Sequence, residues 1–167
     1  MTRVKQVLDV ALQWMCIVLL AALVVIVAWQ VFARQVLSDP STWSEELAKY
    51  VFIWLGLFGA ALVFGERGHI AVDALVRKLP ERWQRRDAVF CQVVIGVFAA
   101  LVLVYGGWQV SALAWNQAMP GLPLMVGWLY LALPLSGVLV LFYTVYHLVA
   151  VVRGAEGAAV DGEPDAI

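Results

Sequence analysis

The stretch that decides the fold runs from residue 88 to residue 152: AVFCQVVIGVFAALVLVYGGWQVSALAWNQAMPGLPLMVGWLYLALPLSGVLVLFYTVYHLVAVV. It contains no Asp, Glu, Lys or Arg. A helix needs about 20 mostly apolar residues to cross a bilayer, so a stretch of this length predicts two spanning helices and a turn. Residues 116–123, NQAMPGLP, supply the turn, because two prolines and a glycine end a helix. We therefore expect an integral membrane protein with spans at about 88–114 and 124–151.

Two further spans are predicted upstream. Residues 10–33 are uncharged and long enough to cross the bilayer. Residues 50–65 are also uncharged but are too few to cross alone. Thr42 and Glu45 have the spacing of a capping box, in which the two side chains satisfy each other's backbone N–H groups at the start of a helix. This spacing predicts a span over about 42–65, with its charged residues at the membrane interface.

The composition agrees with a membrane domain that fills most of the chain. Of the 167 residues, 63% are hydrophobic and 14% are charged, and the mean hydropathy is +0.87. We expect one all-α domain with four spanning helices over 1–153, and a disordered cytoplasmic tail over 154–167, which is rich in Gly, Ala and acidic residues. The alternative for the first span is a signal peptide. Its apolar stretch is longer than the roughly 7–15 residues of a signal peptide, and no A-x-A site follows it.

The basic residues predict the orientation. Of the 11 Lys and Arg residues, only Arg34 and Lys49 fall on the side that holds the loops after the first and third spans. The others lie near the two termini and in the loop between the second and third spans. Cytoplasmic loops carry the excess of Lys and Arg. We therefore expect a multi-pass membrane protein with both termini and the long loop in the cytoplasm.

The loop between the second and third spans has a periodic pattern of its own. Its apolar residues fall on one side of a helical wheel, which predicts a short amphipathic helix at about 70–79 on the cytoplasmic membrane surface. His69 and Asp73 are four residues apart and could form a hydrogen bond along this helix. That pair is interpreted either as a contact on a solvated face or as a proton-handling pair.

The start of the second span holds a group of charges. Glu45 and Lys49 are four residues apart with the acid first, which favours an ion pair, and Glu46 lies on another face. Arg34 ends the first span on the same side of the membrane and could reach either glutamate. Three interpretations stay open: a polar clasp between the first two spans, side chains that reach the surface independently, and a site for a coupling ion.

Small residues and a proline predict how the spans pack. Gly56, Gly59, Ala60 and Ala61 make one side of the second span small, so a neighbouring helix could approach closely. Pro134 should bend the fourth span, because it has no N–H for the helical ladder.

The sequence shows no pattern typical of catalysis or of cofactor binding. Cys16 and Cys91 are single residues in different spans, and His147 is the one histidine in a span, so a haem held by two histidines is not predicted. We interpret His147 as an interfacial group near the cytoplasmic end of its span. We expect no enzymatic activity, no cofactor and no metal site.

Several short motifs occur in a characteristic order between residues 29 and 80, WQVFARQVLSDPSTWSEELAKYVFIWLGLFGAALVFGERGHIAVDALVRKLP. An Arg ends the first span, W-x-E-E opens the second, I-W-L and a Gly-Ala pair follow, and G-H-I-x-V-D comes after it. Together with MPGLPLMVGWLYLALPLSG at 119–137, which includes Pro134, this order resembles the small membrane subunit (DctQ type) of tripartite ATP-independent periplasmic (TRAP) transporters. One departure is Gln35, where many members have an aromatic residue. The matching residues are Arg34, Trp43, Glu45, Glu46, Ile53, Trp54, Leu55, Gly59, Ala60, Gly68, His69, Ile70, Val72 and Asp73.

The resemblance implies a four-helix subunit that binds a large, many-span membrane subunit. In this family the large subunit carries the substrate and sodium, and a soluble periplasmic binding protein delivers the substrate, commonly an organic acid. The small subunit is then a scaffold in an elevator-type transporter, surrounded by membrane lipids and with no nucleic acid partner.

Two other classes stay open. One is a redox membrane anchor that binds quinone or haem, which a visible spectrum would reveal. The other is a self-sufficient small transporter, which would transport without any partner. The absence of charged residues at mid-membrane argues against the second.

Overall fold

A computed structural model describes residues 2–39, 41–65, 81–119 and 121–152 of the chain. Four stretches of helix within these ranges are long and apolar enough to cross a membrane, which confirms the predicted all-α fold with four spanning helices. The predicted amphipathic helix at 70–79 and the tail at 154–167 lie outside the described residues. The helices are α1 (Thr2–Gln35), α2 (Thr42–Gly65), α4 (Glu81–Phe98), the π-helix η1 (Ala99–Gly106), α5 (Gly107–Ala114), α6 (Gly127–Tyr130) and α7 (Ala132–Val152).

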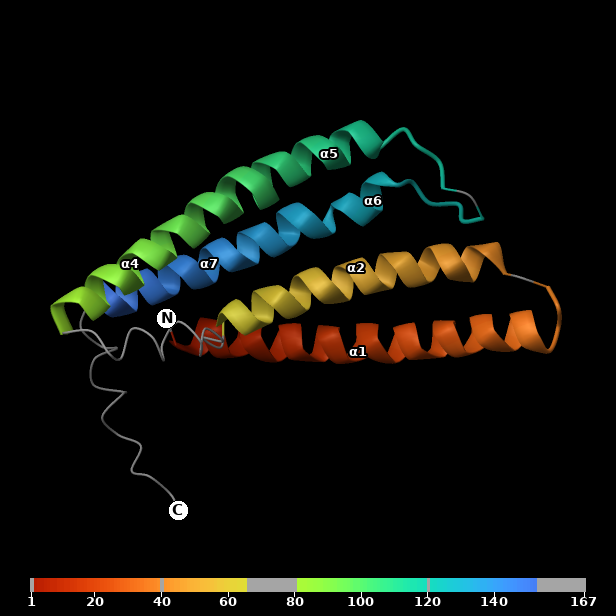
Figure 1. The fold of residues 1–167 in the computed structure, drawn as a ribbon, viewed down its shortest axis with the longest axis horizontal. Coiled ribbons are helices and arrows are strands. Elements are labelled where there is room, and N and C mark those ends of the chain that lie inside the picture. Colours follow the sequence, from red (N-terminus) through yellow and green to blue (C-terminus); the bar gives the residue numbers. More distant parts are fainter. Residues whose placement is uncertain (1, 40, 66–80, 120, 153–167) are drawn as a thin grey trace, which may run out of the picture.

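The helices lie side by side in an open row rather than in a closed bundle (Figure 1). Among the described helices, α1 lies beside α2 alone, α2 lies beside α6 and α7, and α7 lies beside the continuous third span of α4, η1 and α5. Because the row does not close on itself, its apolar side chains stay uncovered on the broad faces. Val25 in α1 is 68% exposed and Leu101 in η1 is 61% exposed. In a bilayer these faces lie against lipid or against another membrane protein.

Two clusters of buried side chains hold neighbouring helices of the row together. The first joins α1, α2 and α7, and the second joins α2, η1 and α7. Their buried members are Leu12, Phe58 and Tyr143 in the first cluster, and Ala61, Ala99 and Val140 in the second.

The fourth span is interrupted at Leu131, between α6 and α7. Pro134 lies three residues later, and its nitrogen carries no hydrogen to donate to the carbonyl of Tyr130. The ladder resumes where the N–H of Leu135 donates to the carbonyl of Leu131 at 3.3 Å. The interruption agrees with the predicted break in the helical ladder at Pro134, and the predicted bend of the span stays a prediction.

The third span contains a π-helix that the sequence pattern does not predict. The segment η1 packs so closely against α7 that a Cβ added to Gly137 would lie 2.7 Å from Cβ of Leu103. A Cβ added to Gly107, just after η1, would lie 2.7 Å from Cβ of Leu133 and 3.0 Å from Cδ of Pro134. These two glycines allow the third and fourth spans to approach each other.

Candidate functional site

The predicted turn between the third and fourth spans is a small hairpin that packs on the start of α2. Ala118 and Met125 form an antiparallel bridge, and the N–H of Val126 donates to the carbonyl of Gln117 at 3.0 Å. The hydroxyl of Tyr50 in α2 donates to the carbonyl of Met125 at 3.0 Å. This hydrogen bond fastens the hairpin to the second span.

Gly121 at the tip of the hairpin lies directly against α2. It has φ of +82°, which glycine adopts without strain, and an added Cβ would lie 3.2 Å from the nitrogen of Trp43. Trp43 itself is 44% exposed. The tryptophan of the W-x-E-E motif therefore lies at the junction of the hairpin and the second span.

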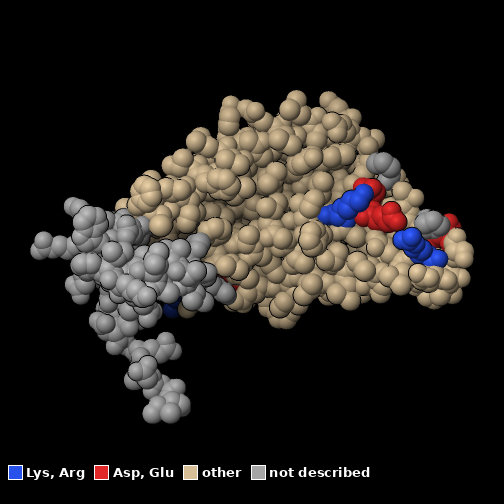
Figure 2. All heavy atoms as spheres, in the orientation of Figure 1, with Lys and Arg blue, Asp and Glu red and all other residues tan. Residues whose placement is uncertain are grey.

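Charged side chains gather at the end of the molecule where α1 and α2 meet (Figure 2). Lys49 forms an ion pair with Glu46, with 2.7 Å between Nζ and Oε1. The prediction that Lys49 would pair with Glu45 is wrong. Both spacings allow contact on a helix surface, so the choice between i,i+3 and i,i+4 depends on side-chain conformations that the spacing does not fix. Glu45 is exposed.

The predicted clasp between the first two spans is absent from the described residues of the isolated chain. Arg34 is exposed, and no ion pair joins it to Glu45 or Glu46. Instead, Nε2 of Gln30 in α1 donates to the carbonyl of Ser44 in α2 at 2.7 Å. Sequence reasoning missed this contact. The signal for it was a single amide side chain in an otherwise apolar part of the first span.

The helix start at α2 differs by one residue from the predicted capping box. The carbonyl of Ser41 accepts from the N–H groups of Ser44 and Glu45, at 3.2 Å and 3.4 Å, and from the hydroxyl of Ser44 at 2.9 Å. The residue whose carbonyl accepts the first helical hydrogen bond is the N-cap. Ser41 is therefore the N-cap, and the predicted pairing of Thr42 with Glu45 as a capping box is wrong.

Trp54 and Pro134 contribute to packing inside the chain. The ring of Trp54 meets that of Phe58 edge to face, with 5.4 Å between centroids, and packs against the first core cluster. Pro134 is buried against the third span. His69 and Asp73, the two motif residues of the cytoplasmic loop, lie outside the described residues.

His147 is buried within the chain. It is 5% exposed, and its ring packs edge to face on Tyr146 with 5.6 Å between centroids. Contacts within the chain therefore bury its ring, and its predicted depth near the cytoplasmic end of the span stays a prediction. Within the described ranges, no group of three His, Cys, Asp or Glu side chains is placed to hold a metal ion.

The small residues of α2 divide into two groups. Ala61 is fully buried in the second core cluster, as the predicted close packing requires. Gly56 and Gly59 have no heavy atom of the described chain within 4 Å of an added Cβ. No helix among the described residues packs on these two glycines, so the close approach of a neighbouring helix there stays a prediction.

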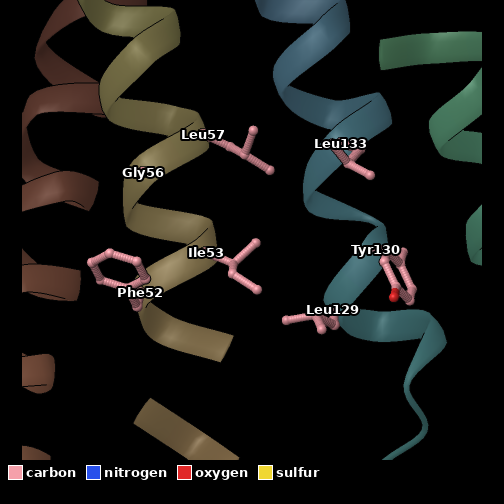
Figure 3. A pocket seen from close by; sticks show the side chains of 7 residues that line it. All are labelled: Phe52, Ile53, Gly56, Leu57, Leu129, Tyr130 and Leu133. Carbon is pink, nitrogen blue, oxygen red and sulfur yellow. The ribbon is translucent and has the colours of Figure 1, made fainter. Parts of the chain in front are cut away.

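An apolar groove runs beside Gly56, between α2 and the α6–α7 segment (Figure 3). Its volume is about 320 Å³. Ile53 and Leu57 point from α2 toward α6–α7, and Leu129 points back toward α2. The full set of lining residues is Phe52, Ile53, Gly56, Leu57, Leu129, Tyr130 and Leu133.

An open row of spanning helices, with uncovered apolar faces and a charged end, defines a multi-span membrane protein. Residues 23–154 match the family described as "Tripartite ATP-independent periplasmic transporters, DctQ component". The chain belongs to this family, whose members are small permease subunits of TRAP transporters. It is a transport component and not an enzyme.

The curated relatives fall into two kinds. The sialic acid TRAP transporter small permease protein SiaQ of Vibrio cholerae is 28% identical over 84% of this chain and 83% of its own length. A putative TRAP transporter small permease protein of Haemophilus influenzae is 30% identical over 85% of this chain and 88% of its own length. The sialic acid TRAP transporter permease protein SiaT of H. influenzae is 28% identical over 78% of this chain, but the match covers only 21% of SiaT. In SiaT, a small-permease sequence is thus part of a much longer permease chain.

Proposed function

We propose that this chain is the small scaffold subunit of a sodium-coupled TRAP transporter that takes up an organic acid. It works with a large membrane subunit and a periplasmic binding protein. The observation that carries the proposal is the open row of four spanning helices in a chain that belongs to the small-permease family. The fused permease SiaT supports a large membrane partner, because there the small-permease sequence is only about a fifth of the chain.

The charge distribution supports a scaffold role. Residues 10–33, 50–65 and 88–152 contain no Asp, Glu, Lys or Arg, so the middle of each span offers no ionised side chain. Sodium and organic acids need polar coordination to cross a bilayer. The transport path is therefore assigned to the large subunit. The small subunit widens and anchors the static part of an elevator-type transporter.

The orientation is part of the same proposal. Both termini lie in the cytoplasm of a bacterial cell, because the Lys and Arg residues are concentrated there. The α1–α2 turn and the hairpin at 116–126 then face the periplasm. The structured, charged surface at that end is available to the periplasmic binding protein.

A deletion in the native organism tests the proposed function. Removing this gene while the large subunit is still produced should abolish sodium-dependent uptake of the organic acid, and the gene supplied in trans should restore it. Unchanged uptake in the deletion strain, with the large subunit present at its normal level, would contradict the proposal.

A further inference from the structure

The glycines of this chain fall into two groups. At some positions close packing within the chain leaves no room for a larger residue, and at others it does not. An added Cβ at Gly65, Gly107, Gly127 or Gly137 would lie 2.6–2.7 Å from a neighbouring side chain, so close contact within the chain accounts for these four. Gly56 and Gly59 have only open space around them among the described residues. A glycine in a helix interior is less favourable than alanine. Packing within the subunit therefore does not explain why glycine stands at positions 56 and 59.

Gly56 and Gly59 belong to one exposed strip of α2 that runs along the membrane-spanning part of the helix. At 100° per residue, Phe52, Gly56, Gly59 and Val63 project within about 60° of one another. Phe52 is 64% exposed and Val63 is 52% exposed. The strip therefore has a bulky apolar residue at each end and two glycines between them.

The groove adjoins this strip, with Phe52 and Gly56 in its lining, and lies between two contacts that α2 makes with the third-to-fourth-span hairpin and with α7. Toward the charged end, the hydroxyl of Tyr50 binds the carbonyl of Met125 at 3.0 Å. Toward the other end, Ala61 and Val140 are buried against each other's helices in the second core cluster, with 0% and 3% exposure. The gap between α2 and α6–α7 is thus built into the fold.

We infer that the glycine strip and the groove of α2 are the docking surface for a transmembrane helix of the large permease subunit. The inference rests on the proposed function and adds the contact surface. A glycine surface lets a second helix backbone approach closely, which strengthens packing where no hydrophobic effect drives association. The groove then receives an apolar side chain of that helix. A flexible acyl chain gains no comparable advantage from glycine, because it adapts to any apolar side chain.

The length of the fused relative SiaT supports a helix of a large permease subunit as the partner of this surface. In SiaT the small-permease sequence occupies 21% of the chain, so most of that protein is permease sequence outside it. In this chain α2 is an inner helix of the row, yet its strip faces outward. A large membrane partner that lies against the row covers this strip without displacing α1 or α7.

Co-purification of this chain with the large TRAP permease subunit of the same organism tests the docking surface. Gly56→Leu and Gly59→Leu add a bulky side chain where a new Cβ has no heavy atom of the described chain within 4 Å, and Ala21→Leu adds the same side chain on the exposed side of α1 as a matched control. We expect Gly56→Leu and Gly59→Leu to reduce the co-purified large permease by about tenfold or more, and Ala21→Leu to leave it unchanged. The melting temperature of each variant alone should not fall below that of the wild type. Full retention of the large permease by both glycine variants would overturn the inference.

Photocrosslinking identifies the occupant directly. With p-benzoylphenylalanine in place of Phe52, the inference predicts a covalent adduct to the large permease in co-expressing membranes, identified by mass spectrometry of the adduct. Adducts to phospholipid alone would overturn the inference in favour of an acyl-chain site. If the wild-type chain does not retain the large permease at all, the proposed function fails. If it does, and the position 52 probe reaches only lipid, only the docking surface fails.

Discussion

The hydroxyl of Tyr143 in α7 donates a 2.6 Å hydrogen bond to Oδ1 of Asp9 in α1, across 134 positions of the sequence. The other carboxylate oxygen of Asp9 lies 2.7 Å from Nζ of Lys5, and that ammonium group lies 5.9 Å from the centroid of the Tyr143 ring. The helices α1 and α7 are not neighbours in the row. Tyr143 reaches past the end of α2, where an added Cβ at Gly65 would lie 2.7 Å from its ring. One buried side chain therefore links the first and fourth spans at the end where α1 begins.

Removing this hydroxyl should destabilise the isolated subunit. Tyr143 is fully buried, so Tyr143→Phe keeps the packing and leaves Asp9 without its tyrosine donor. A hydrogen bond to a charged group contributes about 1.5–3 kcal/mol, and we expect a loss of that size in the free energy of unfolding. Equilibrium unfolding in detergent measures it. Tyr146→Phe is the matched control, because within the described residues its hydroxyl makes no hydrogen bond. Equal effects of the two substitutions would show that the link to Asp9 contributes nothing.

Two glycine-to-alanine substitutions should change stability in opposite directions. In Gly137→Ala the new methyl group would lie 2.7 Å from Cβ of Leu103 and 3.1 Å from the nitrogen of Val104 in η1, so the third and fourth spans must separate. We expect a cost of about 1–3 kcal/mol. In Gly59→Ala the methyl group meets open space, and the better helix propensity should add up to about 1 kcal/mol. Thermal unfolding of the two purified variants compares them. Equal destabilisation by both would contradict the close packing of η1 against α7.

Charge pairs at the start of α2 can be separated with double-mutant cycles. The pair of Lys49 with Glu46 is largely exposed on the lysine side, at 62%, so we expect a coupling energy below about 1 kcal/mol that weakens in salt. Arg34→Ala and Glu46→Ala should be additive in the isolated chain, because no ion pair joins them in the structure. A clear coupling energy between Arg34 and Glu46 in detergent would contradict this prediction and support an ion pair between the first two spans.

The parts of the fold that local sequence determines could be predicted. Uncharged stretches between charged residues defined the spans, because ionised side chains are expensive in hydrocarbon. The turn at 116–123 followed from its prolines and glycine, and the break in the fourth span followed from the missing N–H of Pro134. Each of these depends on residues close together in the sequence.

The parts that depend on distant residues could not be predicted. No local pattern pairs Asp9 with Tyr143 or Gln30 with Ser44, because both contacts need the helices placed side by side first. The arrangement of the helices in an open row could not be predicted for the same reason. In hydrocarbon, apolar patterning does not mark a core side, so the neighbours of each helix are set by close packing at positions such as Gly137. The sequence did not determine whether Lys49 pairs with Glu46 or with Glu45, because both spacings allow an ion pair on a helix.

Reporter fusions test the proposed orientation. A phosphatase that is active only in the periplasm should be active when fused at Gly121, in the hairpin between the third and fourth spans. It should be inactive when fused at Glu81 or after Arg153, because the basic residues keep these positions in the cytoplasm. A cytoplasmic reporter at the same three positions gives the complementary pattern and controls for expression. Periplasmic activity at Glu81 would contradict the orientation.

We expect this chain to be required for transport but to contain no transport path of its own. Uptake into proteoliposomes with an imposed sodium gradient measures this directly, with the purified binding protein and its labelled organic acid outside. Vesicles that contain both membrane subunits should accumulate substrate, and vesicles that contain this chain alone should show no uptake above protein-free vesicles. Sodium-dependent uptake by this chain alone, or full uptake by the large subunit without it, would contradict the account.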